Sequence, residues 1–141
     1  KFHISKIKKI LFVLFVFLFI SIGLGKSAVA ITESKELRKC VVITHCVLNN
    51  WSTNNVEKSF KEAYEIVKNT PRTKIIKEDK DYIHAEATTR WMHYIDDLEI
   101  KALPKLSIIQ IRSESRVGIG DNGVNKNRVA KIKSKMNYIN D

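Results

Sequence analysis

The sequence predicts a single α+β domain in which two helices cover an antiparallel sheet of four strands, in the chain order αββββα. Three observations support this fold. An amphipathic helical stretch precedes Pro71, four short strand-like runs follow it, and a second amphipathic stretch lies near the end of the chain. Successive strands with short connections pair in antiparallel fashion, so we expect both helices to cover one face of the sheet.

The helices are predicted from apolar residues that recur at helical spacing. Thr53-Asn54-Asn55 offers capping side chains for the first helix, which Pro71 ends. The apolar residues on one face of this helix are Val56, Phe60, Ala63, Tyr64 and Val67. The second helix is predicted over Asn125–Tyr138, and its apolar side carries Val129, Ile132 and Met136.

The strands are predicted from four short runs rich in β-branched and aromatic residues, which are Thr73–Lys77, Tyr82–Trp91, Tyr94–Ile100 and Leu106–Ser113. The second run alternates between apolar and polar residues, so we expect one of its faces to be Ile83, Ala85, Ala87 and Trp91. A short loop that contains Pro104 joins the last two runs, and the sequence contains no internal repeat.

Composition and length exclude several classes of protein. The chain is 44% hydrophobic and 28% charged, which is not typical of a disordered protein. It is too short for a two-domain enzyme or a TIM barrel. Residues 1–30 contain five lysines and no acidic residue, so half of the net charge of +10 belongs to this segment. The charge is therefore no argument for a nucleic-acid partner, and we predict none.

Residues 1–30 are predicted to form a secretory signal peptide. Lys1–Lys9 is basic, Ile10–Leu24 is almost wholly apolar, and Ala28-Val29-Ala30 supplies small residues at a cleavage site. A helix over the apolar run is about 22 Å long, shorter than a hydrocarbon core of roughly 30 Å. We therefore expect cleavage after Ala30, with retention of residues 10–24 as a short membrane anchor as the alternative.

Either way, we expect the domain to be exported across a membrane, into a periplasm or a thylakoid lumen. Residues 31–39 are then a polar tether, and residues 40–138 are the domain. An oxidising compartment allows a disulfide between Cys40 and Cys46. Closing it requires a turn, whereas Val41, Val42 and Ile43 favour a strand, so a disulfide and a buried free thiol both stay open. A zinc site of Cys40, His45 and Cys46 would need a fourth ligand, and none occurs at a suitable spacing, so we predict neither a metal nor a cofactor.

The most informative segment of the sequence is Arg112–Arg128, which contains three glycines in a G-x-G-x-x-G pattern. A dinucleotide site would need a βαβ unit of about 30 residues and an acidic residue about 20 residues further on. Only 18 residues follow Gly123, and no strand is predicted among them. A phosphate-binding loop is also excluded, because no Gly-Lys-Ser/Thr follows the glycines.

The same segment does have the properties of an anion receptor. Exposed backbone N–H groups of a glycine-rich turn, the start of a helix and several cations can together hold a phosphate or a carboxylate. The candidate residues are Arg116, Gly118, Gly120, Gly123, Asn125, Lys126 and Arg128. We expect Asp96 and Arg112 to support the site as a pair on one face of the last two strands. The alternative is that the arginines only pair with the protein's own carboxylates.

Three blocks of the sequence resemble a family known as domain of unknown function 1499. The first is the Arg-Ser-x-Ser-Arg-x-Gly run of residues 112–118, followed by Asp-x-Gly-x-Asn at residues 121–125 and by Arg128. The others are Asp96-Asp97-Leu98-Glu99 and the segment Cys40–Val47. The resemblance spans roughly residues 40–136. It implies a small exported or envelope-associated α+β domain and assigns no activity to it.

Three functions remain open. The first is a non-enzymatic exported domain that binds an anionic group, whether phosphate, carboxylate or lipid headgroup. The second is a structural or protein-interaction module of the envelope or thylakoid lumen. The third is a small hydrolase that uses Asp97 or Glu99, which share a strand face about 6–7 Å apart. The basic C-terminal helix could contact anionic lipid headgroups or be an ordinary solvated face.

Overall fold

The structure, a computed structural model, describes residues 35–139. The predicted signal peptide or anchor therefore lies outside the described residues. The chain divides into two units between Glu33 and Ser34, and all the elements described below belong to the second unit, residues 34–141. No helix in the described range is long and apolar enough to span a bilayer.

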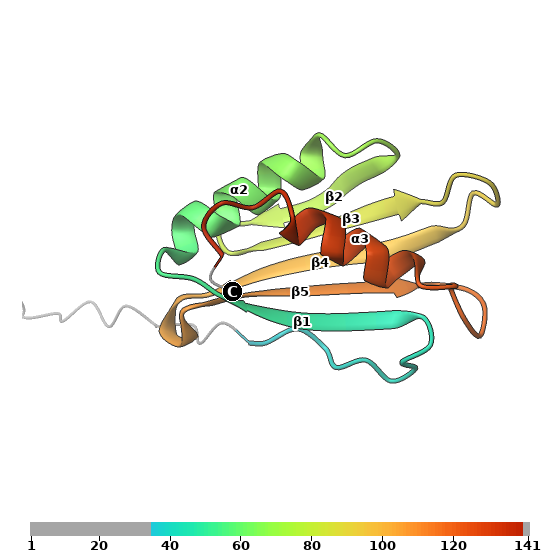
Figure 1. The fold of residues 1–141 in the computed structure, drawn as a ribbon, viewed down its shortest axis with the longest axis horizontal. Coiled ribbons are helices and arrows are strands. Elements are labelled where there is room, and N and C mark those ends of the chain that lie inside the picture. Colours follow the sequence, from blue (N-terminus) through green and yellow to red (C-terminus); the bar gives the residue numbers. More distant parts are fainter. Residues whose placement is uncertain (1–34, 140–141) are drawn as a thin grey trace, which may run out of the picture. The chain divides into compact units, whose positions relative to one another are not determined.

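Five antiparallel strands form one sheet in the spatial order β1-β5-β4-β3-β2 (Figure 1). Their bounds are Cys46–Ser52 for β1, Thr73–Asp79 for β2, Tyr82–Thr88 for β3, Ile95–Leu103 for β4 and Ile108–Ser115 for β5. A 3₁₀ turn, η1 (Pro104–Leu106), joins β4 to β5. The predicted α+β class is thus confirmed, but the predicted number of four strands is wrong.

The missing strand is β1, at one edge of the sheet. It pairs with β5 from Cys46 opposite Glu114 to Ser52 opposite Ile108. Its sequence contains Asn49 and Asn50, and asparagine is disfavoured in strands by local preference. The segment is extended because β5, some 60 residues further along the chain, offers it hydrogen-bond partners, and local sequence does not encode this pairing.

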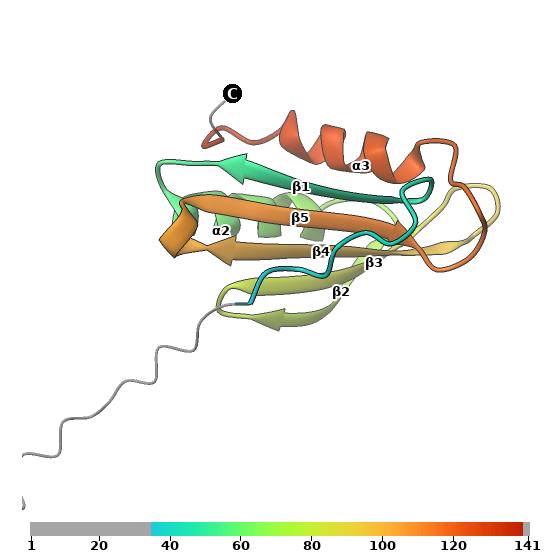
Figure 2. The same cartoon turned by 90° about the horizontal axis from the view of Figure 1, so that it is seen from below.

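Both helices lie on the same side of the sheet (Figures 1 and 2). Helix α2 spans Val56–Lys68 and begins as predicted, because the Asn55 side chain accepts a hydrogen bond from the Lys58 backbone N–H at 2.9 Å. Helix α3 spans Val124–Lys133, so it ends earlier than the predicted Tyr138. Its residues Val129 and Ile132 join the same hydrophobic core as Ala63 and Val67 of α2.

The sheet has one apolar face and one polar face. The face beneath the helices carries the buried core residues of the strands, which include Ile83, Ala85, Leu98, Ile100, Ile109 and Ile111. The other face is charged, and the segment before β1 crosses it (Figure 2). There Leu37 is buried and donates its backbone N–H to Gln110 Oε1. Trp91 is not on the apolar face, contrary to prediction, because β3 ends at Thr88 and leaves Trp91 exposed in a loop.

The unit of residues 34–141 has its own hydrophobic core and a disulfide, and its size is typical of a domain that folds independently.

We expect Ile111→Ala to lower the free energy of unfolding of this unit by about 2–5 kcal/mol, because it removes a fully buried side chain from a central strand. Ile76→Ala, on the edge strand β2 and half-exposed, should cost less than about 1 kcal/mol. Urea denaturation measures both variants. Equal losses would contradict the assignment of the core to the face beneath the helices.

Candidate functional site

Three loops and the start of α3 meet at one end of the sheet. The loops are residues 89–94 between β3 and β4, residues 116–123 after β5, and residues 40–45 before β1. The backbone N–H of Arg116 donates to Ile95 O at 3.4 Å, and that of Asp121 donates to Thr44 O at 3.3 Å. The Thr44 hydroxyl also donates to Ile119 O. These bonds tie residues 116–123 to the loop before β1 and to the start of β4, which directly follows residues 89–94.

The start of α3 is held by a carboxylate of the protein itself. Gly123, the N-cap, has a φ of 79°, a left-handed conformation that favours glycine. Asp121 accepts hydrogen bonds from the backbone N–H groups of Gly123 at 2.9 Å and Asn125 at 2.7 Å. The glycine-rich turn therefore does hold an anion at a helix start, and that anion is the side chain of Asp121.

These bonds decide the protonation of Asp121. Partial burial raises the pKa of its carboxyl, but the hydrogen bonds from the backbone and side chain of Asn125 and from Gly123 outweigh burial, so the pKa is lowered. Asp121 is therefore a fixed negative charge at neutral pH, and it occupies the place at which the sequence analysis expected an external anion.

Asn125 joins α3 to the sheet through a buried hydrogen-bond network. Its side-chain oxygen accepts from the Ser113 hydroxyl at 2.6 Å and from Arg128 Nη1. Its side-chain nitrogen donates to the Ser115 hydroxyl at 2.9 Å and to His45 O at 3.1 Å. Asn125 thus has a structural role that its place in the sequence motif did not indicate.

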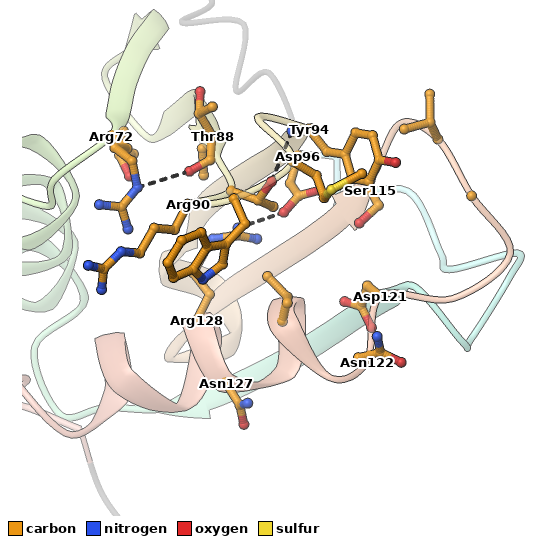
Figure 3. Close-up of a pocket in the computed structure, with 18 of the residues that line it drawn as sticks. Arg72, Thr88, Arg90, Tyr94, Asp96, Ser115, Asp121, Asn122, Asn127 and Arg128 are labelled. Atoms are coloured by element: carbon orange, nitrogen blue, oxygen red, sulfur yellow. Dashed lines mark hydrogen bonds and ion pairs between the residues drawn. The ribbon is translucent and has the colours of Figure 1, made fainter.

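Arg128 extends this network to a buried carboxylate on β4. Its Nη2 donates to Asp96 Oδ2 at 2.6 Å, and Figure 3 shows the side chain reaching from α3 toward Asp96. Asp96 is fully buried, and its second oxygen, Oδ1, has no hydrogen-bond partner among the described residues. Arg128 is therefore already neutralised by a carboxylate of the protein.

The predicted Asp96–Arg112 pair does not exist. Asp96 lies opposite Ser115 and Arg112 lies opposite Glu99, so the two residues lie on opposite faces of the sheet. The hairpin turns later than predicted, because β4 continues to Leu103 and η1 forms the turn. The residue opposite Asp96 is therefore Ser115, three positions beyond the expected Arg112. A shift in register by an odd number of residues places a side chain on the other face of the sheet.

Arg112 lies on the polar face and is 1% exposed. Its Nη1 pairs with Glu99 Oε2 at 2.9 Å, and its Nη2 pairs with Glu114. Tyr82 donates to the other oxygen of Glu99 at 2.7 Å, and burial together with this bond raises the pKa of the Tyr82 phenol. Arg112 is thus a buried structural cation with two acidic partners.

Arg116 lies on the same polar face, apart from Arg128. Its guanidinium contacts Asp97 at 2.7 and 3.1 Å and Glu86 at 2.7 Å. His84 Nε2 lies 2.7 Å from Asp97 Oδ1. Arg112, Arg116 and Arg128 thus all pair with the protein's own carboxylates, which is the alternative to an anion site that the sequence left open.

Asp97 and Glu99 share the polar face, as expected. Burial raises the pKa of Asp97, but the hydrogen bonds and charges of Arg116 and His84 outweigh it and lower the pKa. A general acid that works near neutral pH needs a raised pKa instead. The geometry therefore offers no support for Asp97 as a proton donor in hydrolysis.

Cys40 and Cys46 form a disulfide with a Cα–Cα distance of 5.6 Å. Residues 43–45 form a turn, and the His45 N–H faces Val42 O at 3.5 Å, so the expected strand over Val41–Ile43 is absent. No cluster of metal-binding side chains occurs within the described residues.

A cavity of about 970 Å³ opens at this end of the sheet, between α3 and the loops (Figure 3). Its walls are mainly apolar, with Trp91, Met92, Tyr94, Val117 and Val124 among the lining residues. Asp96, Ser115 and Arg128 supply polar groups. Four cations line it, which are Arg72, Arg90, Arg128 and Lys131.

The cavity includes only part of the predicted site. Gly118, Gly120 and Arg128 line it, whereas Arg116, Gly123, Asn125 and Lys126 do not. Arg72 and Arg90 were not predicted, because they lie on segments far from the glycine motif in the sequence. Lys131 lies on the predicted basic helix, and only the tertiary fold brings it together with the two arginines. Trp91 was predicted to share a strand face with Ile83, Ala85 and Ala87, and in the structure it lines the cavity instead.

Comparison with known proteins gives a family and no activity. A family model described as protein of unknown function (DUF1499) matches residues 34–136. A search of curated proteins found no match to the chain.

We expect Asp121→Asn to destabilise the unit of residues 34–141 by about 0.5–2 kcal/mol at pH 7, because an amide can accept a hydrogen bond at only one of the two positions from which Asp121 caps α3. Because the folded-state pKa of Asp121 lies below its ordinary value of 3.8, its stabilisation is present above that pH and is lost on further acidification. The variant should therefore lose less stability than the wild type between neutral pH and acid.

Urea denaturation across this pH range measures the difference. Asp79→Asn, at the exposed end of β2, is the control for the loss of one surface carboxylate. An Asp121→Asn variant with the wild-type pH dependence would contradict the role of Asp121 as the anion of the loop.

Proposed function

The chain belongs to the DUF1499 family, and we propose that it binds a small amphipathic anion, an apolar body that carries a phosphate or carboxylate group, in the cavity at the end of the sheet. One observation carries this proposal. Arg72, Arg90 and Lys131 line the cavity, and none of them forms an ion pair with a carboxylate in the part of the chain that the structure describes.

The charges of the lining favour an anion. Asp96 is paired with Arg128, and Asp121 is held by Asn125 and Gly123, so both acidic residues of the cavity are already engaged. The remaining cations give the cavity a positive potential, which attracts anionic ligands. The ligand class is the one that the sequence analysis expected, but its place moves from the glycine motif to the cavity.

The walls favour an apolar body. The volume of about 970 Å³ is at the upper end of the range of roughly 300–1,000 Å³ that is typical of ligand pockets. Trp91, Met92, Tyr94 and Val117 line the cavity and are largely exposed to solvent. Their burial against a ligand would contribute roughly 25 cal/mol for each Å² of apolar surface removed from water.

We also propose that the domain works outside the cytoplasm, in a periplasm or a thylakoid lumen. The pattern of residues 1–30 is that of a signal peptide. The Cys40–Cys46 disulfide agrees with an oxidising compartment, because such bonds are rare in reducing ones.

Titration of the unit of residues 34–141 with octyl phosphate and with octanoate tests the ligand class. Trp91 lines the cavity and the only other tryptophan, Trp51, is buried in the core, so we expect a change in the fluorescence of Trp91. Lys131→Ala should weaken binding about 3- to 10-fold, since a charged contact is worth roughly 1 kcal/mol or more. Lys126→Ala, on the same helix but outside the cavity, is the matched control and should change little.

Inorganic phosphate should bind more weakly than octyl phosphate, because it cannot use the apolar walls. If Lys126→Ala weakened the binding of octyl phosphate as much as Lys131→Ala does, the cavity would not be the binding site, and the glycine motif would again be the candidate. A folded protein that binds neither octyl phosphate nor octanoate would overturn the proposal.

A further inference from the structure

Three exposed apolar loop tips lie at the end of the sheet that holds the cavity, and we propose that they dock the domain onto the surface of a membrane that contains anionic lipids. The tips are the pairs Val41 and Ile43, Trp91 and Met92, and Val117 and Ile119. Ile43, Trp91 and Ile119, one from each loop, are 83%, 81% and 89% exposed. This docking does not depend on whether the cavity holds a ligand.

The tips belong to one surface. The hydrogen bonds of Thr44 with Asp121 and Ile119 join the first loop to the third. Trp91, Met92 and Val117 line the same cavity, which places the second loop beside the third. Scattered apolar side chains are normal on a soluble protein, whereas a cluster on neighbouring loops indicates an interaction site.

Each tip is held in its exposed position by a local constraint. The Cys40–Cys46 disulfide closes the first loop, so the backbone that carries Val41 and Ile43 cannot extend into a strand. In the second loop, the backbone N–H of Thr89 donates to Tyr94 O and that of Tyr94 donates to the Thr89 hydroxyl, both at 2.9 Å. The side chain of Asp121 and the bonds to Thr44 fix the third. The fold thus presents these side chains to the outside.

The charges around the tips complement an anionic surface. The three loops contain a single acidic residue, Asp121, and it is engaged by α3. Lys39 and Arg90 flank the first two tips, and neither has a carboxylate partner among the described residues. Lys126, in the first turn of α3 directly after the third loop, adds a further cation. Anionic headgroups attract such a surface by roughly 1 kcal/mol per cation close to it.

The shape of the surface favours a lipid bilayer over a protein partner. A stable protein interface buries about 800 Å² on each side as a continuous, close-packed patch. Here the apolar groups are pairs on separate protruding tips, with cations beside them, an arrangement that can insert into the headgroup region while the cations contact phosphates. Tryptophan, present in the second tip, is enriched at membrane interfaces.

Vesicle binding by the unit of residues 34–141 tests the proposal. This unit is used because the apolar run 10–24 could bind lipid by itself. We expect it to co-sediment with vesicles of phosphatidylcholine and phosphatidylglycerol more than with phosphatidylcholine alone, and less as salt is raised. Trp91 fluorescence should shift to shorter wavelength and be quenched by brominated lipid chains, because Trp91 enters the bilayer interface.

Two aspartate variants make the test specific. Ile119→Asp should lower the partition coefficient at least about tenfold, because it removes an inserted aliphatic group and adds a repelled charge. Leu106→Asp is the matched control. Leu106 is also exposed, at 55%, but lies in η1 at the opposite end of the sheet, and its variant should bind within about twofold of the wild type.

Three results would overturn the proposal. The first is no binding to the mixed vesicles at low salt, and the second is equal loss in Ile119→Asp and Leu106→Asp. The third is a dimer in analytical ultracentrifugation that Ile119→Asp dissociates, which would make a second copy of the chain the occupant of the tips. A protein that binds octyl phosphate but no vesicles would retain the cavity site and lose this one.

Discussion

The pairing of β4 with β5 decides where the charged residues of this domain lie. Asp96 lies opposite Ser115 and Glu99 lies opposite Arg112. Because side chains alternate along a strand, this register directs Asp96 toward the helices and Arg112 toward the polar face. Arg116, just beyond β5, also reaches the acidic residues of the polar face, whereas Arg128 approaches Asp96 from α3. One register therefore divides a single sequence motif between two separate networks.

In both networks a buried charged side chain is paired with groups of opposite charge. A buried ion without a partner costs several kcal/mol, so Arg112 at 1% exposure requires both Glu99 and Glu114. On the other face, Asp96 requires Arg128, and Asn125 connects Arg128 with Ser113 and Ser115. These residues fix α3 and the glycine-rich loop to the sheet. A short polar sequence motif can thus serve to hold a helix and a loop against the sheet.

Local sequence predicted the parts of the fold that depend on local physics. Helix α2 follows from the periodicity of Val56 to Val67 and from the Asn55 cap, and β3 follows from its alternation between Ile83 and Ala87. The edge strand β1 could not be predicted, because its asparagines oppose a strand and its pairing is with distant β5. The register between β4 and β5 depends on where the hairpin near Pro104 turns. The predicted register was wrong by an odd number of residues, so Asp96 and Arg112 were predicted on the same face but lie on opposite faces.

The cavity and its cations could not be predicted from the sequence for a related reason. An anion receptor needs cations whose charge is not already neutralised, and a sequence shows the cations without their partners. The motif contributed Arg112, Arg116 and Arg128, each of which pairs with a carboxylate in the fold, and Asp121, which itself occupies the helix start. The cations of the cavity that have no acidic partner among the described residues are Arg72, Arg90 and Lys131, and they come from a turn, a loop and a helix that meet only in three dimensions. Because these cations surround a cavity whose rim is apolar, the same end of the sheet offers charge for an anionic group and exposed surface for a hydrocarbon one. Molecules that combine both groups are therefore the ligands that we propose for this end of the domain.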